Sequence, residues 1–383
     1  MRIGLDGYPL SEIRTGIGHY TFELGKHLAA ATRDDEFRFI SPRPFDDSIT
    51  GDLNFHQLPS ASKLRFVHAE TNIITRHWWS TGLPRYLRRE KIELFHGTNY
   101  QIPLFGSCPS IVTIHDLSLL LHPATHNKRA VYRARIFLSR VVRRARMIIT
   151  PTESVRSEVV EHLKVAPEKI VAIPEAARDC FRALPADSTL EVRRRLKIKD
   201  DFLLCVATLE PRKNLERLLS AFTDLLRTTD LRPQLVLVGR EGWLVADLMR
   251  RMNAANLSEN LRWVGYISDD DLCALYSSCR LFIYPSLYEG FGLPPLEAMS
   301  CGAPVIASRI ASIAEVTGQA ARLIPSTDTK SLTKSIATLW HDAAARRQLS
   351  VCGLERAKEF TWKRTAELKN EVYRRVIREP RDN

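Results

Sequence analysis

The chain has 383 residues, 44% of them hydrophobic and 26% charged, which is typical of a globular protein and excludes a disordered or membrane-spanning chain. Because single hydrophobic cores stop growing at roughly 250 to 300 residues, this length predicts two domains. The net charge of +12 fits nucleic acid, anionic lipid or phosphate-bearing substrates as partners. The seven scattered cysteines form no CxxC pair, which argues against a disulfide framework and against a zinc site.

The N-terminal segment MRIGLDGYPL reads as a first strand and lacks the features of a signal peptide, so we expect a cytoplasmic protein. An amphipathic stretch follows at 20–31, and strand-like runs then alternate with helical patterns. These runs are FRFI, LFHG, SIVTIHD, MIITPTES and KIVAIPE. The alternation predicts a doubly wound, mostly parallel α/β sheet.

The same pattern starts again near residue 200, after a polar passage at 178–201. Its strand-like runs are DFLLCVATLE, PQLVLVGR, LRWVGYI, LFIYPS and PVIAS. We therefore expect a first domain over 1–180, a second over 198–360 and a charged amphipathic helix over 361–383. Considered alone, that helix would cap the second domain; our prediction is that it packs back on the first.

Parallel sheets bind ligands at the carboxyl ends of their strands, and two motifs of the first domain lie there. In RTGIGHY, Gly16 and Gly18 precede a helix, where they either let a ligand approach the backbone or form a tight turn. In VTIHDLS, His115 and Asp116 end a β-rich run. The histidine either contacts a substrate hydroxyl or has a structural role, and nothing nearby has metal-ligand spacing.

In the second domain, VATLEPRKNLERLL places Arg212 and Lys213 between a strand and a helix, with Asn214 as a candidate N-cap. Adjacent cations beside a helix N-terminus suit a leaving diphosphate, although two solvated charges would look the same in sequence.

The stretch YPSLYEGFGLPPLEAMSCGAPVIAS contains Glu289 and Glu297, with seven residues between them. The prolines at 294 and 295 suit the first turn of a helix that Gly302 closes, which puts Glu297 in that turn beside the helix dipole. Glu289 would then be a loop acid. Alternatively, Gly290 and Gly292 expose N–H donors between two acceptors, an arrangement that suits a polyhydroxylated, phosphorylated ligand.

This stretch resembles the signature of the retaining glycosyltransferases of family 4, which have the GT-B fold. Similar segments are TLEPRKNL, LVLVGREGW, VGYISDDDLCALY, VTIHDLS and FTWKRT, so that the resemblance covers nearly the whole chain. It implies two Rossmann-like, doubly wound domains that face each other across a cleft. The implied reaction is hexosyl transfer (EC 2.4.1.-) from a nucleotide sugar, with no metal and no other cofactor.

The resemblance also implies a role for each matching residue. Glu289 would hold hydroxyls of the donor sugar, Glu297 the ribose, and Arg212 and Lys213 the departing diphosphate. His115 would lie near the transferred sugar and, with Asp116 and Thr152, near the acceptor. The other implied donor contacts are Gly16, Gly18, Thr208, Gly265, Tyr266, Ile267, Gly290, Phe291, Gly292 and Leu293.

Two segments depart from the family pattern. VATLEP lacks a Gly-Arg pair that some relatives use as a phosphate contact, which leaves more of that task to Lys213 and Arg212. IPEAARDCF lacks the usual Asn-Gly and leaves Glu175 without a role. Charge growing on the diphosphate is the main catalytic problem in this mechanism, and preorganised cations and N–H groups would stabilise it.

Positive charge gathers between Leu117 and Thr152, where the sequence has no acidic residue. A helical stretch there combines many arginines with Tyr132, Phe137 and other apolar residues, so an anionic membrane surface at the inner face of the cytoplasmic membrane is a candidate partner. Trp78 and Trp79 would extend that surface. Alternatively, the apolar face packs on the sheet and the arginines are solvated.

Two other classes of protein fit parts of the sequence. A nucleic-acid-binding protein would explain the charge, but no binding motif accompanies it. A nicotinamide dehydrogenase would need a complete glycine fingerprint, which is absent. Within the transferase class, the motifs resemble bacterial mannosyltransferases that use GDP-mannose to build surface polysaccharides such as O-antigen or exopolysaccharide on a glycan or lipid-linked acceptor. A UDP-sugar donor is the alternative.

Overall fold

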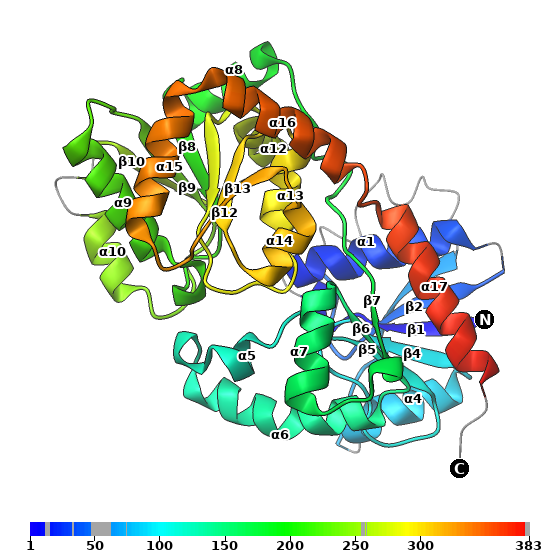
Figure 1. Cartoon of the computed structure of the whole chain (residues 1–383). Coiled ribbons are helices and arrows are strands. Elements are labelled where there is room, and N and C mark those ends of the chain that lie inside the picture. The colour runs from blue at the N-terminus through cyan, green and yellow to red at the C-terminus, as the bar shows by residue number, and fades with distance from the viewer. Residues whose placement is uncertain are drawn as a thin grey trace. The chain divides into compact units, whose positions relative to one another are not determined.

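The computed structural model describes residues 1–11, 16–32, 34–46, 63–73, 75–253, 257 and 259–379 (Figure 1). The chain divides into two compact units. The first unit comprises Met1–Leu117, Tyr132–Glu175 and Thr361–Asn383, and the second comprises Ser118–Val131 and Ala176–Phe360. Each unit has its own parallel sheet.

The sheet of the first unit has seven strands within the described residues, in the order β3-β2-β1-β4-β5-β6-β7, all parallel. They are β1 (Arg2–Asp6), β2 (Glu36–Ser41), β3 (Leu64–His68), β4 (Leu94–Gly97), β5 (Ser110–Thr113), β6 (Met147–Thr150) and β7 (Ile170–Ala172). Every residue of β4, β5 and β6 is buried, as expected for parallel strands that are covered on both faces. The strand order reverses between β1 and β4, which makes this a doubly wound sheet.

Helices cover this sheet on both faces (Figure 1). They are α1 (Gly16–Ala31), α4 (Leu83–Arg89), α6 (Lys128–Arg144), α7 (Glu153–Leu163) and α17 (Trp362–Arg378), with the short helical turns η1 (Tyr8–Leu10), η3 (Trp78–Gly82) and η5 (Pro167–Lys169). Helix α17 lies beside α1, so the two ends of the described chain meet in one unit. The first residues of α6 belong to the second unit.

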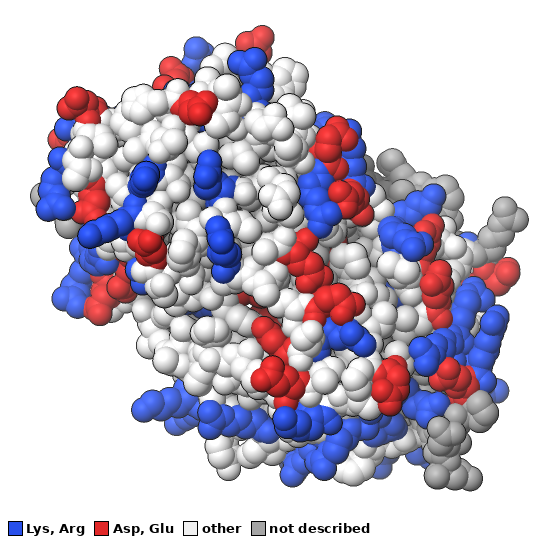
Figure 2. Space-filling model, viewed as in Figure 1, with Lys and Arg blue, Asp and Glu red and all other residues white. Residues whose placement is uncertain are grey.

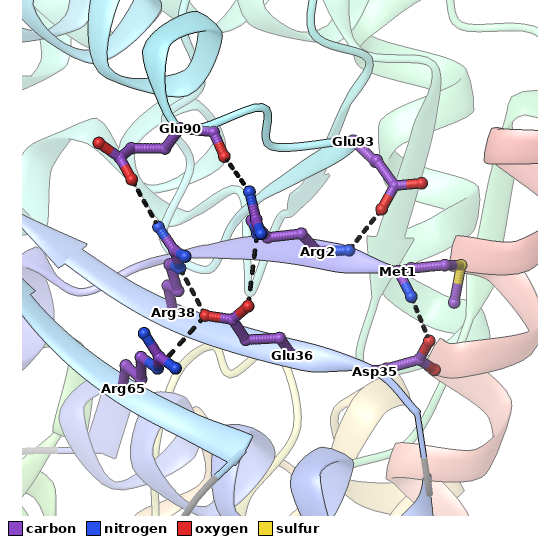
Figure 3. Close-up of polar contacts among 8 residues, drawn as sticks. All are labelled: Met1, Arg2, Asp35, Glu36, Arg38, Arg65, Glu90 and Glu93. Atoms are coloured by element: carbon purple, nitrogen blue, oxygen red, sulfur yellow. Dashed lines mark hydrogen bonds and ion pairs between the residues drawn. The ribbon is translucent and has the colours of Figure 1, made fainter.

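An ion-pair network holds the amino ends of β1 and β2 together (Figure 3). Arg2 Nε and Arg38 Nε donate to the two oxygens of Glu36, at 3.3 and 2.8 Å, and Arg38 Nη1 donates to Glu90 Oε2 at 2.9 Å. Burial opposes the ionisation of Glu36, but Arg38 and the other guanidinium groups outweigh it and lower the pKa of this carboxyl. The network lies at the end of the strands opposite to the one where ligands bind parallel sheets, so its role is structural.

The second unit repeats the architecture with six parallel strands among its described residues, in the order β10-β9-β8-β11-β12-β13. They are β8 (Phe202–Val206), β9 (Gln234–Val238), β10 (Leu261–Gly265), β11 (Leu281–Tyr284), β12 (Val305–Ser308) and β13 (Ala321–Ile324). Along β8, Phe202 and Leu204 point into one hydrophobic cluster while Leu203 and Cys205 point into another. The alternation shows that both faces of this sheet are buried.

Helices of the second unit pack on those two faces. They are α8 (Ala186–Leu196), α9 (Leu215–Thr228), α10 (Ala246–Met252), α12 (Asp269–Ser278), α13 (Leu293–Ser300), α14 (Ala311–Thr317), α15 (Thr329–His341) and α16 (Ala343–Ala357), with the 3-10 turn η6 (Pro211–Lys213). The unit also includes α5 (Ser118–Leu121) and the 3-10 turn η4 (Pro123–Thr125), which contact each other.

The structure differs from the sequence prediction in several boundaries. The chain leaves the first unit after Glu175, and 176–197 belongs to the second unit, because α8 packs against α12 there. The second unit also includes 118–131, which the predicted first domain contained. The predicted strands did not include β3 and β13.

Candidate active site

Two loops of the second unit meet at the carboxyl ends of the neighbouring strands β8 and β11. The backbone N–H of Leu287 donates to the carbonyl of Arg212 at 2.8 Å. The side-chain amide of Asn214 donates to the carbonyl oxygens of Pro285 and Ser326, both at 2.9 Å. Asn214 therefore occupies the N-cap position of α9 as predicted, but its side chain joins loops and does not cap the helix.

Glu289 lies at the centre of this junction and is only 8% exposed. Its Oε1 accepts hydrogen bonds from Lys213 Nζ at 2.6 Å and from the Tyr284 hydroxyl at 2.8 Å. Its Oε2 accepts from Arg212 Nη1 at 3.0 Å. The sequence analysis did not single out Tyr284. Its position as the last residue of β11 could have indicated that it lies in the site. The structure thus brings three of the predicted catalytic residues into direct contact.

The charges of this cluster are strongly coupled. Burial opposes the ionisation of Glu289, but Lys213 and Arg212 outweigh it and lower its pKa to about 2. Glu210, which Arg212 Nη2 contacts at 2.6 Å, shows the opposite balance, because burial raises its pKa more than Arg212 lowers it. Two cations are thus held in fixed positions at a strand end, where they can interact with a phosphate group.

The loop after Glu289 depends on a glycine. Gly292 has a φ of +106°, a value that favours glycine, and it is the N-cap of α13. A Cβ added there would lie 2.3 Å from Cδ1 of Ile313. Ser312 Oγ donates to the carbonyl of Glu289 at 2.5 Å, which fixes the start of the loop. Leu293 begins α13, so the amino end of this helix directly follows the loop.

Gly290 and Phe291, two of the predicted donor contacts, are buried in the same loop. The ring of Phe291 meets that of Phe360 edge-on, with 5.8 Å between the centroids. The side chain of Phe291 therefore packs in the core, and only its backbone N–H remains as a potential ligand contact.

Glu297 is also buried, but the prediction that it lies in the first turn of its helix is wrong. Helix α13 begins at Leu293, one residue before the proline pair, so Glu297 lies in the second turn. It accepts from the Tyr276 hydroxyl at 3.2 Å and lies 3.7 Å from Arg178 Nη2. Burial raises its pKa, Arg178 opposes this shift and Asp269 adds to it.

Arg178 is a residue that sequence reasoning did not single out. It pairs with Asp269 as well as Glu297, and its guanidinium carbon lies 4.8 Å from the ring centroid of Phe181. These groups fix Glu297 at the side of the second unit where α12 begins. The sequence around Arg178 does not indicate this role, because its partners lie about a hundred residues further along the chain.

The remaining predicted donor contacts of this unit lie at the carboxyl ends of β8 and β10. Thr208 is exposed in the loop after β8. Gly265 ends β10 with a φ of +73°, and nothing lies within 4 Å of a Cβ added to it. Tyr266 is 51% exposed under the guanidinium of Arg240, while Ile267 packs on the core.

In the first unit, His115 follows β5 with both ring nitrogens engaged, Nδ1 with Glu175 Oε1 at 3.0 Å and Nε2 with the carbonyl of Thr98 at 2.8 Å. The backbone N–H of the next residue, Asp116, donates to the Tyr100 hydroxyl at 2.9 Å. Glu175, which had no role in the sequence, is thus the carboxylate partner of the predicted active-site histidine.

The other predicted residues of the first unit have distinct environments. Thr152 is buried and caps α7, because its Oγ1 accepts from the backbone N–H of Val155 at 3.2 Å. Gly16 begins α1 and is exposed, with nothing within 4 Å of an added Cβ, whereas Gly18 is buried. The first two residues of RTGIGHY, 14 and 15, lie outside the described residues.

Helix α6 carries the predicted basic surface. Figure 2 shows a row of Lys and Arg side chains where Figure 1 places this helix. Leu138, Val141 and Val142 are buried, yet Tyr132 and Phe137 remain 68% and 48% exposed. Trp78, predicted to extend this surface, is buried in the core instead, and Trp79 is half-buried, because η3 turns Trp78 inward.

No described helix is both long and apolar enough to cross a membrane. Among the described residues, no group of three or more His, Cys, Asp or Glu side chains has the arrangement of a metal site.

Comparison with protein families matches both units. Residues 14–177 match the model described as glycosyltransferase family 4, and residues 188–355 match the one described as glycosyl transferases group 1. The chain is 32% identical to O-antigen chain mannosyltransferase B of Escherichia coli over 93% of both chains. The protein therefore belongs to the family 4 glycosyltransferases.

Two further similarities agree with this. Over 70% of its length the chain is 31% identical to the serotype-specific mannosyltransferase WbdA of Escherichia coli, of which it covers 34%. The structure superimposes on HepE of Anabaena, solved in complex with UDP-glucose, with a TM-score of 0.77 and 16% identity over 98% of this chain and 99% of that one. The protein is thus a glycosyltransferase with the GT-B fold, as the sequence motifs predicted.

Proposed function

We propose that the protein transfers a mannosyl group from GDP-mannose, with retention of configuration, to a glycan or lipid-linked acceptor during the synthesis of a surface polysaccharide. The names of its relatives support the sugar, since O-antigen chain mannosyltransferase B and WbdA are both mannosyltransferases. The observation that carries the proposal is the buried contact of Glu289 with Lys213 and Arg212 at adjoining strand ends.

In this proposal the cations act on the leaving group. As the bond between the sugar and the diphosphate breaks, negative charge grows on the diphosphate, and Arg212 and Lys213 stabilise it. Both are fixed before the reaction by Glu289, Glu210 and Tyr284, so little reorganisation is needed when the charge develops.

The carboxylates hold the hydroxyl groups of the donor. Glu289 has a low pKa and stays ionised at neutral pH, which suits it to accept hydrogen bonds from the sugar. Glu297 accepts from the ribose. The N–H groups of the 290–293 loop face the sugar and diphosphate, and the loop at 265–267 lies beside the base, with Thr208 near the phosphates.

We assign the acceptor side to the first unit, where His115, Asp116 and Thr152 lie at or beside the carboxyl ends of β5 and β6. Gly16 and Gly18 of α1 remain proposed contacts of the donor. We also propose that the transfer needs no divalent metal, because Arg212 and Lys213 supply cationic charge at the diphosphate. Equal activity in EDTA and in added Mg²⁺ is the expected result, and loss of activity in EDTA would contradict it.

We further propose that the enzyme acts in the cytoplasm, at the inner face of the cytoplasmic membrane. The exposed Tyr132 and Phe137 beside the arginines of α6 support this, because aromatic and basic groups together favour an anionic bilayer. Flotation with vesicles that contain anionic phosphatidylglycerol should recover the protein at low salt, and Phe137→Ser should weaken it. Failure to float at low salt would contradict the membrane proposal alone.

The donor is tested with a panel of GDP- and UDP-sugars, each scored by thermal shift and by slow hydrolysis of the sugar nucleotide. GDP-mannose should give the largest shift and the fastest hydrolysis. A larger response to a UDP-sugar would contradict the donor but keep the transferase, because UDP-sugars are the alternative donors in this family. No response to any member would contradict the assignment of the site.

A further inference from the structure

The ring of His115 faces two hydrogen-bond acceptors. Nδ1 lies 3.0 Å from Oε1 of Glu175, and Nε2 lies 2.8 Å from the carbonyl oxygen of Thr98. Only 13% of the His115 side chain and 6% of the Glu175 side chain are exposed. Water therefore competes little for these two contacts.

Counting protons fixes the state of this ring. A backbone carbonyl can only accept, so Nε2 must carry a hydrogen and donate it to Thr98. A neutral ring would then present the lone pair of Nδ1 to a carboxylate oxygen, and two lone pairs repel. A second proton must therefore lie between His115 and Glu175. Because imidazole is a stronger base than a carboxylate, this proton resides mainly on the ring.

Other titratable groups from the surrounding elements face this pair. From α1, the ring of Tyr20 meets His115 at 89°, with 4.6 Å between centroids, and Tyr100 lies at 5.9 Å. Burial lowers the pKa of Lys369, on α17, to about 7, while the charge of Glu175 opposes the shift. Burial also lowers the pKa of His96, on β4, and the charges of Lys369 and His115 add to this. Glu175 supplies negative charge among these bases.

The backbone around Glu175 is held on two sides. Ile173 donates its N–H to the carbonyl of Thr150, which continues the pairing of β7 with β6, at 2.8 Å. Thr365 of α17 donates its hydroxyl to the carbonyl of Pro174, also at 2.8 Å. Glu175 is the last residue of the first unit before the chain enters the second. Its carboxylate is therefore presented from a fixed position.

We propose that Glu175 is a positioning residue that keeps His115 doubly protonated and locked against Thr98. His115 then contributes a fixed positive charge and a ring surface, and neither nitrogen is available to take a proton from an acceptor hydroxyl. This inference rests on the proposed function, which places His115 at the site of transfer. It gives a role to a carboxylate that no motif of the sequence explained.

The protonation state is measured directly by NMR of the protein labelled with ¹⁵N-histidine, without any substrate. Among the 11 histidines, one should show both ring nitrogens protonated at neutral pH, and His115→Asn should remove that signal. In Glu175→Gln the side-chain amide can donate to Nδ1, so His115 should become neutral with its proton on Nε2. An unchanged His115 signal in Glu175→Gln would overturn the inference.

Kinetics with GDP-mannose separate positioning from a merely structural role. Glu175→Gln should lower kcat about ten- to a hundredfold with little change in the KM for the donor, since a misplaced or neutral ring affects the chemical step. Glu175→Asp keeps the carboxylate and should retain most of the activity. Glu161→Gln, on the exposed side of α7, is the matched control and should behave as wild type.

The outcomes distinguish the two levels of the proposal. If His115→Ala has wild-type activity, the proposed function of His115 fails. If His115→Ala is impaired but Glu175→Gln is not, or if Glu175→Asp is as impaired as Glu175→Gln, the positioning role of Glu175 fails while the function stands.

Discussion

Lys213 Nζ lies 2.6 Å from Glu289 Oε1 in a site where each side chain is about a tenth exposed. The carboxylate also receives Arg212 and the hydroxyl of Tyr284, so one acid orients two cations. Removing either partner of a buried pair leaves the other charge uncompensated. The pair therefore links the chemistry of the site to its stability, and the two effects must be measured separately.

The first prediction concerns the charge of Lys213. Lys213→Met keeps most of the side-chain volume but removes the cation, and it should lower kcat/KM by about two to three orders of magnitude, the effect typical of losing one preorganised group at a developing charge. Lys334→Met, at an exposed position of α15, is the control. The measurement is steady-state kinetics of both variants, after circular dichroism has shown that they are folded. Wild-type turnover in folded Lys213→Met would remove the assignment of the diphosphate site.

The second prediction concerns Glu289 and acid. Its pKa is about 2 in the folded protein against an ordinary 4.5, so it stabilises the fold above pH 4.5 and loses this contribution as the pH falls toward 2. The full contribution is about 3 kcal/mol. Wild type should thus be more stable than Glu289→Gln at neutral pH, and this difference should shrink below about pH 4.5.

Urea unfolding at pH 6 and at pH 3 measures this difference. The raised pKa values of Glu210 and Glu297 have the opposite sign, but both residues are present in both proteins. A difference in unfolding free energy that does not change with pH would show that the cations do not hold Glu289 ionised.

The catalytic role of Glu289 is tested by kinetics. Glu289→Ala should lose several kcal/mol of transition-state stabilisation, measured as a fall in kcat/KM relative to wild type.

The third prediction uses two glycines of α1. A Cβ at Gly16 would meet nothing within 4 Å, so Gly16→Ala should leave the unfolding temperature unchanged or slightly higher. If the donor approaches this backbone, the same variant should raise the donor KM at least about tenfold, which is about 1.4 kcal/mol. Unchanged kinetics would remove Gly16 from the site.

Gly25 is the matched comparison in the same helix. A Cβ there would lie 2.2 Å from Cζ of Phe39, so Gly25→Ala should lower the stability by about 1 to 3 kcal/mol through overpacking. Thermal unfolding of the two variants side by side separates the packing effect from the ligand effect.

The fourth prediction concerns Lys369, which is buried in the first unit and donates to the Tyr20 hydroxyl. Burial lowers its pKa from 10.5 to about 7, so between these values the unfolded chain binds a proton that the folded protein does not. The contribution of this group to stability should therefore rise with pH from about 7 to about 10.5. Lys369→Met should lack this rise.

Urea unfolding of wild type and Lys369→Met at pH 7 and at about pH 9.5 measures the effect. The wild type should gain up to a few kcal/mol relative to the variant over this interval. Parallel pH profiles of the two proteins would show that Lys369 remains charged in the fold.

The motifs predicted the second-unit cluster well, because its members come from loops that follow neighbouring parallel strands. Arg212, Lys213 and Glu289 are close because β8 and β11 pair, and the strand pattern indicated both strands. The predicted start of α13 was one residue too late, since prolines define only roughly where a helix begins, and Glu297 therefore lies just beyond the first turn.

The contacts of other residues could not be predicted from the sequence. The tail reads as a charged amphipathic helix, and a helical pattern does not reveal that Lys369 lies on its buried face next to Tyr373 and Ala366. The pairing of Glu175 with His115 and that of Arg178 with Asp269 and Glu297 join residues 60 to 119 positions apart. Local periodicity carries no information about such contacts.

The return of α17 to the first unit has a consequence for synthesis on the ribosome. Residues 176–360, which form most of the second unit, are translated before this helix. Until α17 emerges, His96 lacks the Tyr373 hydroxyl that it contacts at 2.6 Å, and Tyr20 lacks Lys369. The unit that is translated first is therefore completed last, and its exposed α1 surface needs protection from aggregation throughout elongation.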